Sequence, residues 1–411
     1  MGRWVVTGGI LVLAAVGAAL QPADAGSPGR AASTPLYGVT WRGSLALVRV
    51  APKTLRPLPG PSVRLAGEPL GWSFAPDRSR LALGSAPHGG RLRLIDLRRM
   101  RQLGDVQVTG RGSLIASAWV GPARVLAVVV IPGCCGAGDT IVAGVDARRR
   151  RVLWRRTLGG SLQAGEHLRR GVVLLLGPRG RSVGSSRLVR VSPQGSVRSA
   201  ALPEIRSGTE SKGRVTRSWD PGLTVDRWGG RAFVVQAEAP VVEVNLTTFG
   251  VQSHPLLPPP RTADAVTGPS RQALWLGRGM LAVTGSDAGG AVRTRPAGLT
   301  LVDTRSWRAR TIDRRTSDAV LVSGTLLASS FLFDARAQDA FGSGLTGYTV
   351  SGRPRFHLFA NEPITGAQPL GHTALVGMRD RIVLIDARTG RRLRSYRRLT
   401  TSLLVGDASF H

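Results

Sequence analysis

Apolar and polar positions along the chain form short segments that predict β-strands separated by turns. Ile141–Asp146 is apolar and β-branched, Arg148–Arg151 is polar, and apolar residues return in Val152–Leu158. This pattern predicts two strands joined by a tight turn. The same pattern returns at Ile382–Leu393, and shorter versions occur at Leu47–Val50, Leu94–Asp96, Leu188–Val191 and Leu301–Asp303. A strand–turn–strand unit that recurs along 411 residues predicts a repeat architecture.

Each repeat is predicted to hold four strands. An inner strand that often contains Trp is followed by a long apolar strand, a third strand that ends in Asp, and an outer strand rich in Arg. Full units are predicted at Leu70–Val108, Leu114–Leu158, Ala164–Pro203, Leu223–Leu256, Gln272–Ile312, Ala319–Phe359 and Gln368–Arg397. Two pieces remain: Ser402–Asp407 resembles a lone inner strand, and Tyr37–Leu58 resembles the three strands that lack one.

Joined, these two pieces complete one more unit, so the pattern predicts an all-β fold, a β-propeller of about eight four-stranded blades. The ring would be closed by pairing of the N- and C-terminal strands. Seven blades is the alternative, because Thr262–Thr267 and Ile205–Pro221 blur two of the boundaries.

Two motifs resemble known propeller superfamilies. Trp72–Asp77 is similar to the Phe-Ser-Pro-Asp-Gly turn of WD-repeat-like propellers, and the spacing of Asp146 and Trp154 resembles the Ala-x-Asp-x-x-Thr-Gly-x-x-x-Trp motif of quinoprotein-like propellers. Asp386–Gly390 matches the centre of that motif, but Arg394 stands in place of its Trp, and Arg150 stands in place of the Gly after Asp146. These superfamilies host many functions, so the resemblance implies architecture rather than activity.

The N-terminal segment predicts export. Arg3 precedes the uncharged apolar run Val5–Leu20, and Ala23–Ala25 has the small-x-small pattern of a cleavage site. We therefore expect a signal peptide over residues 1–25, a flexible linker over 26–35 and a single propeller domain over 36–411. An uncleaved membrane anchor is the alternative, but Val5–Leu20 is short for a bilayer span.

The charge is strongly positive but spread along the chain. The formal net charge is +31, and only Lys53 and Lys212 are lysines. Arginines occur in every segment, which fits a GC-rich coding background as well as it fits a nucleic-acid surface; a nucleic-acid footprint would cluster and include stacking aromatic residues. We expect a monomer without a membrane span in the mature chain and without specific nucleic-acid binding.

Long loops are predicted to gather on one face of the ring. By topology, the inner-to-second and third-to-outer turns share one face, here called the short-turn face. The second-to-third loops and the crossings between blades share the other, the long-loop face, which receives Pro132–Thr140, Gly177–Ser186, Ser286–Ala297, Phe333–Gly344 and the crossing Glu204–Pro221. Binding residues concentrate on such loops, although tolerated surface insertions are the alternative. The candidate ligand-binding rim is Cys134, Cys135, Asp139, Arg179, Arg181, Asp287, Arg293, Arg295, Asp334, Arg336 and Asp339.

Catalytic and metal sites are weakly indicated. The six histidines are isolated, and no Asp-x-Asp-x-Asp-Gly calcium loop occurs. Asp96, Asp146, Asp303 and Asp386 recur at one strand end and are predicted to cap turns. Trp72, Trp119 and Trp275 are predicted to pack between blades rather than stack on a ligand. We therefore assign no catalytic residue and no metal ligand, and a lactonase-like hydrolytic propeller lacks its ligand set.

The sequence thus predicts an exported, extracytoplasmic β-propeller that acts without catalysis as a binding module through its long-loop face. The expected partner is a protein or an anionic polymer of the cell envelope, with no cofactor. The alternative is a quinoprotein-like oxidoreductase, for which the resemblance implies pyrroloquinoline quinone with calcium and a disulfide ring beside the cofactor.

Cys134 and Cys135 generate the first testable prediction. They are the only cysteines and are adjacent. Cysteines of exported proteins are usually oxidised, although adjacent Cα atoms lie only ~3.8 Å apart, so a bridge between them is a strained ring. We expect a Cys134–Cys135 disulfide; two thiols, or a staple without a redox role, are the alternative. Changing both to serine is expected to leave the melting temperature nearly unchanged, because the ring closes almost no chain loop. Mass spectrometry of non-reduced exported protein tests the bridge, and two alkylatable thiols would contradict it.

Overall fold

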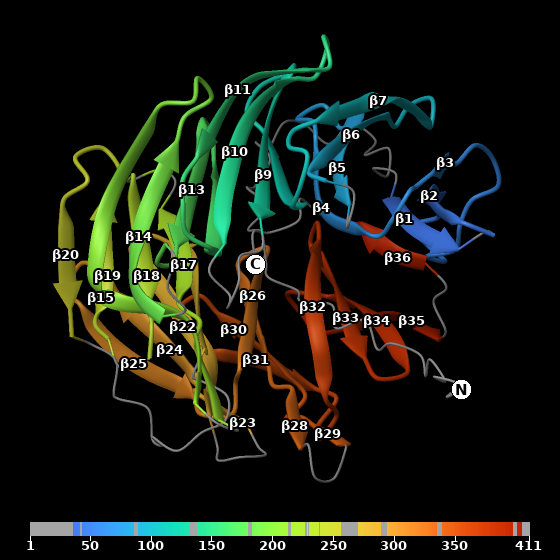
Figure 1. The fold of residues 1–411 in the computed structure, drawn as a ribbon. Coiled ribbons are helices and arrows are strands. Elements are labelled where there is room, and N and C mark those ends of the chain that lie inside the picture. Colours follow the sequence, from blue (N-terminus) through green and yellow to red (C-terminus); the bar gives the residue numbers. More distant parts are fainter. Residues whose placement is uncertain are drawn as a thin grey trace, which may run out of the picture.

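The computed structural model describes a ring of β-sheets. It describes residues 36–41, 43–85, 89–131, 138–179, 183–212, 215–226, 228, 230–237, 239–255, 270–288, 294–334, 339–397 and 401–404. All regular elements in these ranges are strands, and the sheets are arranged around a common centre (Figure 1). None of the described residues belongs to a helix long and apolar enough to cross a membrane. The predicted signal peptide and linker lie outside the described residues.

The described strands form eight four-stranded antiparallel blades, numbered here in chain order from the blade that contains both ends of the propeller. From inner to outer strand, blade 1 consists of β36 (Thr401–Leu404), β1 (Leu36–Trp41), β2 (Leu45–Val50) and β3 (Val63–Arg64), and blade 2 of β4 (Pro69–Phe74), β5 (Arg80–Ser85), β6 (Arg91–Asp96) and β7 (Arg101–Gln107). Blade 3 consists of β8 (Ser113–Trp119), β9 (Arg124–Ile131), β10 (Asp139–Asp146) and β11 (Arg151–Thr157). Blade 4 consists of β12 (Leu162–Leu168), β13 (Gly171–Leu176), β14 (Val183–Val191) and β15 (Val197–Lys212), with β16 (Val215–Trp219) added beside β15.

The second half of the ring repeats this order. Blade 5 consists of β17 (Gly222–Asp226), β18 (Arg231–Val235), β19 (Val241–Asn245) and β20 (Val251–His254). Blade 6 consists of β21 (Ser270–Gly277), β22 (Met280–Ala288), β24 (Leu299–Asp303) and β25 (Arg308–Asp313), with β23 (Thr294–Pro296) beside β22. Blade 7 consists of β26 (Asp318–Val322), β27 (Thr325–Ser329), β30 (Leu345–Thr349) and β31 (Pro354–Leu358), and blade 8 of β32 (Ile364–Leu370), β33 (Thr373–Met378), β34 (Arg381–Asp386) and β35 (Arg392–Arg397). A separate hairpin of β28 (Leu332–Asp334) and β29 (Asp339–Phe341) extends from blade 7. The prediction of about eight blades is confirmed.

The ring closes as predicted, by pairing of strands from the two ends of the chain. Strand β1 pairs antiparallel with β36, so that Tyr37 faces Leu404 and Thr40 faces Thr401. One detail of the prediction is wrong: the outer strand of blade 1 is Val63–Arg64, which lies after Leu58. Pro57 contributes only an isolated bridge to Val50, because a proline nitrogen cannot donate to a strand ladder.

Burial on both faces explains the apolar second strands. Every residue of β13 is buried, and so are Val125–Val129 in β9. A blade has neighbours on both sides, so its middle strands need apolar side chains on both faces rather than on alternate positions. The core is therefore a series of clusters between adjacent blades, such as the one that joins Leu94 and Val106 of blade 2 to Val125 and Val145 of blade 3.

The aspartates at the ends of third strands cap turns, as predicted. Asp146 Oδ1 accepts hydrogen bonds from the backbone N–H groups of Arg148 and Arg149, both at 2.9 Å. Asp386 accepts the equivalent pair from Arg388 and Thr389. Asn245 takes the same role in blade 5. This capping folds the third-to-outer turn so that its carbonyl groups face the preceding blade.

Side chains from the outer strand of the preceding blade donate hydrogen bonds to those carbonyl groups. The Trp154 indole of β11 donates from Nε1 to the Pro193 carbonyl of blade 4 at 3.1 Å. Its ring lies between two glycines, because a Cβ on Gly144 or Gly195 would be 2.4 or 2.6 Å from it. Arg156 adds a bond from Nε to the Gly195 carbonyl at 2.9 Å.

Other residues make the equivalent junction elsewhere in the ring. Arg394, which stands in place of the motif Trp, donates to the Lys53 carbonyl and so joins blade 8 to blade 1. His254 of β20 stacks on Trp307 of blade 6 with ring centres 3.4 Å apart. Further junction contacts are Arg49 to the Leu97 carbonyl, Arg150 to the Leu103 carbonyl, Arg198 to the Thr248 carbonyl, Arg310 to the Ser351 carbonyl, and Phe356 against Gly390.

The inner-strand tryptophans also pack between blades, as predicted. Trp119 donates from Nε1 to the Ser73 carbonyl of blade 2 at 3.0 Å. Trp275 stacks on Phe233 of blade 5 with ring centres 5.3 Å apart. Trp72 packs against the cluster that includes Tyr37 and Val39 of blade 1.

The crossing Glu204–Pro221, expected as a loop, is instead mostly strand. Strand β15 continues to Lys212 and pairs with β16, so this segment lengthens blade 4. The hydrophobic pattern missed it because a two-stranded extension can be polar on both faces.

The closing pair generates the second prediction. Deleting residues 400–411 removes β36 and leaves the edge of β1 unpaired, so we expect less cooperative melting and aggregation. A chain that ends after Leu404 keeps the pair and is the control. Differential scanning calorimetry measures both; identical transitions in the two truncated proteins would contradict the role of this pair.

The glycine beside Trp154 generates the third. Gly195 and Gly277 both have φ +84°, so alanine adds left-handed strain of about 1 kcal/mol at either position. Only at Gly195 would the new Cβ also overlap the Trp154 ring, because nothing lies within 4 Å of that position at Gly277. Such overpacking costs about 1–3 kcal/mol more. We expect Gly195→Ala to lower the urea midpoint further than Gly277→Ala; equal shifts would contradict a fixed ring at this junction.

Candidate functional site

The structure describes part of the predicted rim on the long-loop face. Cys134, Cys135, Arg181, Arg293 and Arg336 lie outside the described residues. Asp334 and Asp339 pair across the β28–β29 hairpin in backbone register. The remaining rim residues are Asp139, Arg179, Asp287 and Arg295.

Asp139 and Arg179 come together across the junction of blades 3 and 4. Asp139 begins β10 and Arg179 follows β13, and Arg179 Nε lies 3.8 Å from Asp139 Oδ1. The Arg179 side chain is 77% exposed and that of Asp139 is 35% exposed. An exposed pair at this distance contributes little to stability. It does place one guanidinium of the predicted rim at the surface.

Asp287 belongs to a separate, buried pair in blade 6. Arg271 Nη2 donates to Asp287 Oδ1 at 2.6 Å, and the two side chains are 7% and 14% exposed. Arg271 also donates to the Ser270 and Ser286 carbonyls. Arg295 faces Asp287 in the β22–β23 register. Sequence reasoning missed Arg271 because it lies in an inner strand rather than in a loop.

These pairs bear on the quinone and calcium alternative. Four acidic loop residues could supply oxygen ligands for calcium: Asp139, Asp287, Asp334 and Asp339. Two of them, Asp139 and Asp287, are paired with arginines. Within the described ranges, no group of three or more His, Cys, Asp or Glu side chains could hold a metal ion.

One carboxyl group on the innermost strands has a strongly shifted pKa. Burial raises the pKa of Asp318, at the start of β26, to about 6, and the Ala319 N–H works against this shift. Asp318 Oδ1 has no hydrogen-bond partner within the described part of the chain. Such a pKa suits proton transfer, but the shift comes from burial and not from a neighbouring charge. Asp318 is thus an isolated titrating group rather than half of an acid–base pair.

Two grooves lined by described residues lie on the opposite, short-turn face. Groove A lies between blades 2 and 3 and has a volume of about 470 Å³. It is lined by Arg80, Arg101, Gln102, Leu103, Ala147, Arg148 and Arg150. Four of these residues are arginines and none is acidic, so groove A is a concentrated region of positive charge.

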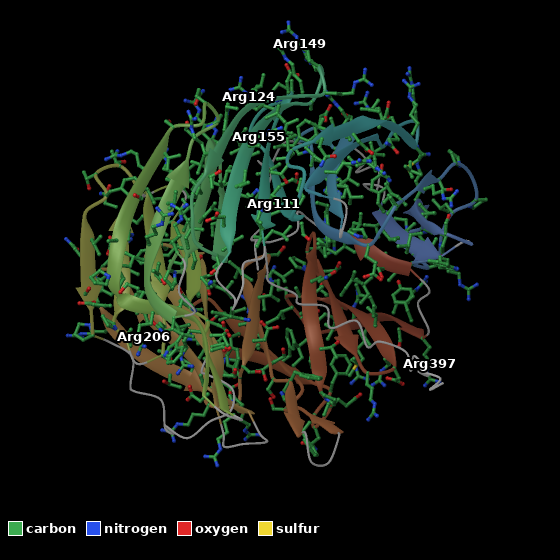
Figure 2. All side chains as sticks on the ribbon, viewed as in Figure 1. Arg111, Arg124, Arg149, Arg155, Arg206 and Arg397 are labelled. Carbon is green, nitrogen blue, oxygen red and sulfur yellow. The ribbon has the colours of Figure 1, made fainter. Side chains whose placement is uncertain are left out.

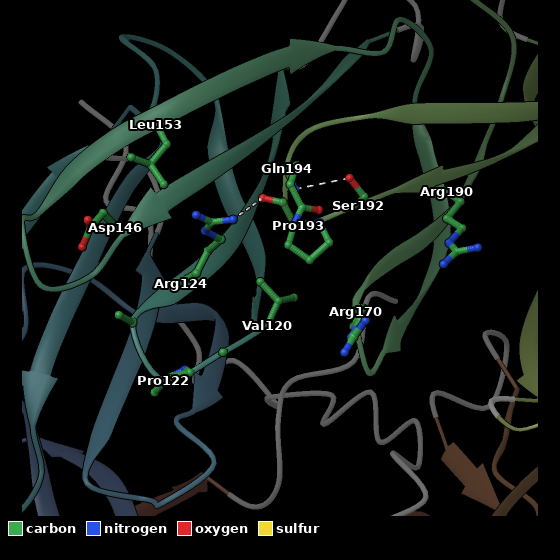
Figure 3. A pocket seen from close by; sticks show the side chains of 12 residues that line it. Val120, Pro122, Arg124, Asp146, Leu153, Arg170, Arg190, Ser192, Pro193 and Gln194 are labelled. Carbon is green, nitrogen blue, oxygen red and sulfur yellow. Dashed lines mark hydrogen bonds between the residues drawn. The ribbon is translucent and has the colours of Figure 1, made fainter.

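Groove B lies between blades 3 and 4 and has a volume of about 530 Å³. Its walls are the inner-to-second turns of both blades, the β14–β15 turn and part of the β10–β11 hairpin (Figure 3). It is lined by Val120, Gly121, Pro122, Ala123, Arg124, Asp146, Leu153, Arg170, Arg190, Ser192, Pro193 and Gln194. Figure 3 shows Arg124 reaching toward the Pro193 carbonyl, with Arg170 and Arg190 on the other side of the groove.

Some of these arginines also fix the groove walls. In groove B, Arg124 donates to the Pro193 carbonyl at 3.3 Å and Arg190 donates to the Leu246 carbonyl at 2.9 Å. In groove A, Arg150 donates to the Leu103 carbonyl at 2.9 Å. By contrast, the side chains of Arg101, Arg148 and Arg170 make no hydrogen bond or ion pair within the described residues. These three guanidinium groups are available to a ligand.

The one carboxylate of groove B is held by its own turn. The backbone N–H groups of Arg149 and Arg148 hold the pKa of Asp146 below its usual range, and the charges of Arg149 and Arg151 lower it further. Asp146 therefore stays ionised at neutral pH, with one oxygen bound to the turn. It does not form an ion pair with a groove arginine within the described residues.

The sequence contained a signal for these grooves. Arg148–Arg151 was recognised as a polar turn, but the pattern does not tell which neighbouring turn its side chains will face. Figure 2 shows Arg149 at the tip of the β10–β11 hairpin and Arg124 below it, whereas Arg206 and Arg397 lie elsewhere on the ring. Arginines are thus spread over the molecule as expected, and grooves A and B are where several converge.

Comparison with known proteins supports the fold. No family model and no curated protein sequence matches the chain. The solved structure of dihydro-heme d1 dehydrogenase NirN in complex with DHE has 13% identity and a TM-score of 0.54, covering 89% of this chain and 74% of that one. The computationally designed Ika8 protein has 11% identity and a TM-score of 0.51, covering 83% and 91%. The Myceliophteria thermophila Cps50 (Swd1) beta-propeller domain has 13% identity and a TM-score of 0.44, covering 80% and 96%.

At these identities the similarity extends to the fold alone. The arrangement of the described strands and these similarities together show a β-propeller fold.

Proposed function

We propose that this protein is a non-catalytic binding module that holds an anionic polymer on its short-turn face. The observation that carries the proposal is the pair of arginine-lined grooves on either side of the β10–β11 hairpin. Both volumes lie in the range of ligand-binding clefts. The proposal moves the main binding surface from the long-loop face of the sequence prediction to the short-turn face, where grooves A and B lie.

The lining residues favour charge recognition. Guanidinium groups bind phosphate and carboxylate oxygens through paired hydrogen bonds. Groove A has no acidic residue to compete for its four arginines. The apolar residues that line groove A are Leu103 and Ala147, whereas groove B has a mixed lining with Val120, Pro122, Ala123, Leu153 and Pro193 beside its arginines. Groove A would thus recognise a partner mainly by its negative charges.

The same lining argues for a polymer without bases. None of the residues that line groove A or groove B is aromatic. Proteins that bind single-stranded nucleic acid stack its bases on aromatic side chains. Because the N-terminal segment predicts export, the polymer we propose is an anionic component of the cell envelope.

Substitution of the available arginines tests this function. We expect Arg101→Gln/Arg148→Gln/Arg170→Gln to weaken binding of linear polyphosphate, used as the probe, in isothermal titration calorimetry. Each lost phosphate contact should reduce the salt dependence of the binding constant, by about 0.7 or more in log–log slope.

The control is Arg169→Gln/Arg305→Gln/Arg388→Gln, which removes the same charge. Arg305 and Arg388 occupy the turn position of Arg148, next to Asp303 and Asp386, and Arg169 adjoins Arg170; none of the three lines a described groove. Equal losses in both triple variants would show that scattered charge binds the polymer and would overturn the proposal.

A further inference from the structure

The arrangement of the two grooves suggests how a long ligand would lie. Both grooves border one element, the hairpin formed by β10 and β11. Ala147, Arg148 and Arg150 of its turn line groove A, whereas Asp146 and Leu153 line groove B. Two paired strands are roughly 5 Å apart, so the two grooves are separated by little more than the width of a hairpin.

The tip of that hairpin is basic as well. Arg149 is exposed between the residues that line the two grooves, and Figure 2 shows its side chain at the outermost point of the hairpin. A chain that leaves groove A and crosses the hairpin would therefore meet a guanidinium before it reaches Arg170 in groove B. Arg149 therefore adds a positive charge to the path between the two grooves, on the same hairpin as Asp146 of groove B.

We propose that one linear polymer with repeated phosphate groups occupies both grooves at once by crossing the β10–β11 turn. This inference rests on the proposed function and adds the ligand class and its mode of binding. Occupation of the second groove would then be intramolecular, which raises affinity without any new contact.

The directions from which the arginines come favour phosphate over carboxylate. In groove A, Arg80 begins β5, Arg101 begins β7, and Arg148 and Arg150 come from the β10–β11 turn. Donors from three separate segments suit an anion whose oxygens point in several directions. A carboxylate has two oxygens in one plane and is satisfied by a single planar fork. A tetrahedral phosphate can accept hydrogen bonds from more than one fork.

The walls of the grooves are fixed before any ligand binds. Arg150 is bound to the Leu103 carbonyl, and the Arg80 guanidinium carbon lies 5.6 Å from the centre of the Trp119 ring. Arg124 and Arg190 are likewise bound to backbone carbonyls. The two grooves therefore keep their spacing, which is the condition for a gain in affinity from bridging.

The experiment compares tripolyphosphate, which can fill one groove, with a long linear polyphosphate. Isothermal titration calorimetry gives the affinity of each for the full chain, for the groove A variant Arg101→Gln/Arg148→Gln and for the groove B variant Arg170→Gln. We expect the long chain to bind the unmodified protein on the order of 10²-fold more tightly than tripolyphosphate. Either single-groove variant should lose at least about tenfold of that gain while still binding tripolyphosphate in the other groove.

Matched controls are Arg305→Gln/Arg388→Gln for groove A and Arg169→Gln for groove B, and both should keep the full gain. If the long polyphosphate exceeds tripolyphosphate in affinity by the same factor in the unmodified protein and in both single-groove variants, bridging is overturned. The higher affinity would then come only from the many equivalent binding segments of a long chain. That result would leave the proposed function intact if the groove variants still bind tripolyphosphate more weakly than their controls. If they do not, the proposed function fails with it.

Poly-glutamate of matched length and charge tests the ligand class. We expect it to bind the unmodified protein at least about tenfold more weakly than polyphosphate does, because its carboxylates accept fewer guanidinium forks. Equal affinity would overturn the assignment to phosphate. Thermal melting confirms that each variant is folded, and the three groove arginines that are replaced make no side-chain bond within the described residues.

Discussion

The whole ring depends on one repeated contact, in which the outer part of each blade packs against the third-to-outer turn of the next. An aspartate or its equivalent folds the turn, as Asp146 and Asp386 do, and the folded turn presents its carbonyl groups to the neighbour. The outer part of the preceding blade contacts this turn through an indole, a guanidinium or another ring. Trp154 and Arg394 donate hydrogen bonds to carbonyl groups of the turn, and His254 stacks on Trp307. Because β1 and β36 close the ring, every blade has a neighbour on both sides and takes part in two such junctions.

This contact also explains why a protein so rich in arginine can still form a regular fold. A guanidinium has five N–H donors and a long apolar stem, so it can bond to a carbonyl of a neighbouring blade while its stem covers apolar surface. Arg150, Arg124 and Arg190 do this at the walls of grooves A and B. The arginines that hold the walls thereby position those that face the ligand, and one residue type serves both the architecture and the proposed binding surface.

Much of the fold could be predicted from the sequence because each blade repeats one local pattern. The positions of Asp146 and Asp386, the closing role of Ser402–Leu404 and the packing of Trp119 all follow from strand periodicity and turn chemistry. The outer strand Val63–Arg64 is too short to leave a periodic signal, and the extension of β15 is polar. The grooves are harder to foresee, because the residues that line each groove come from two blades, as Arg80 and Arg148 do in groove A, and meet only once the ring is built. Local patterns carry no information about that convergence.

Around grooves A and B, the acidic residues of the short-turn face have different partners from Asp139 and Asp287 on the long-loop face, and this gives the positive charge there a direction. On the long-loop face, Asp139 and Asp287 are paired with Arg179 and Arg271. On the short-turn face of blades 2 and 3, the aspartates bond to N–H and hydroxyl groups of their own turns, as Asp77 does with Ser79 and Asp146 does with Arg148. Those bonds hold the carboxylates away from the guanidinium groups of the grooves. Arginines spread evenly along a sequence can therefore produce a concentrated site, because the turns of the fold bind the acids that would otherwise neutralise them.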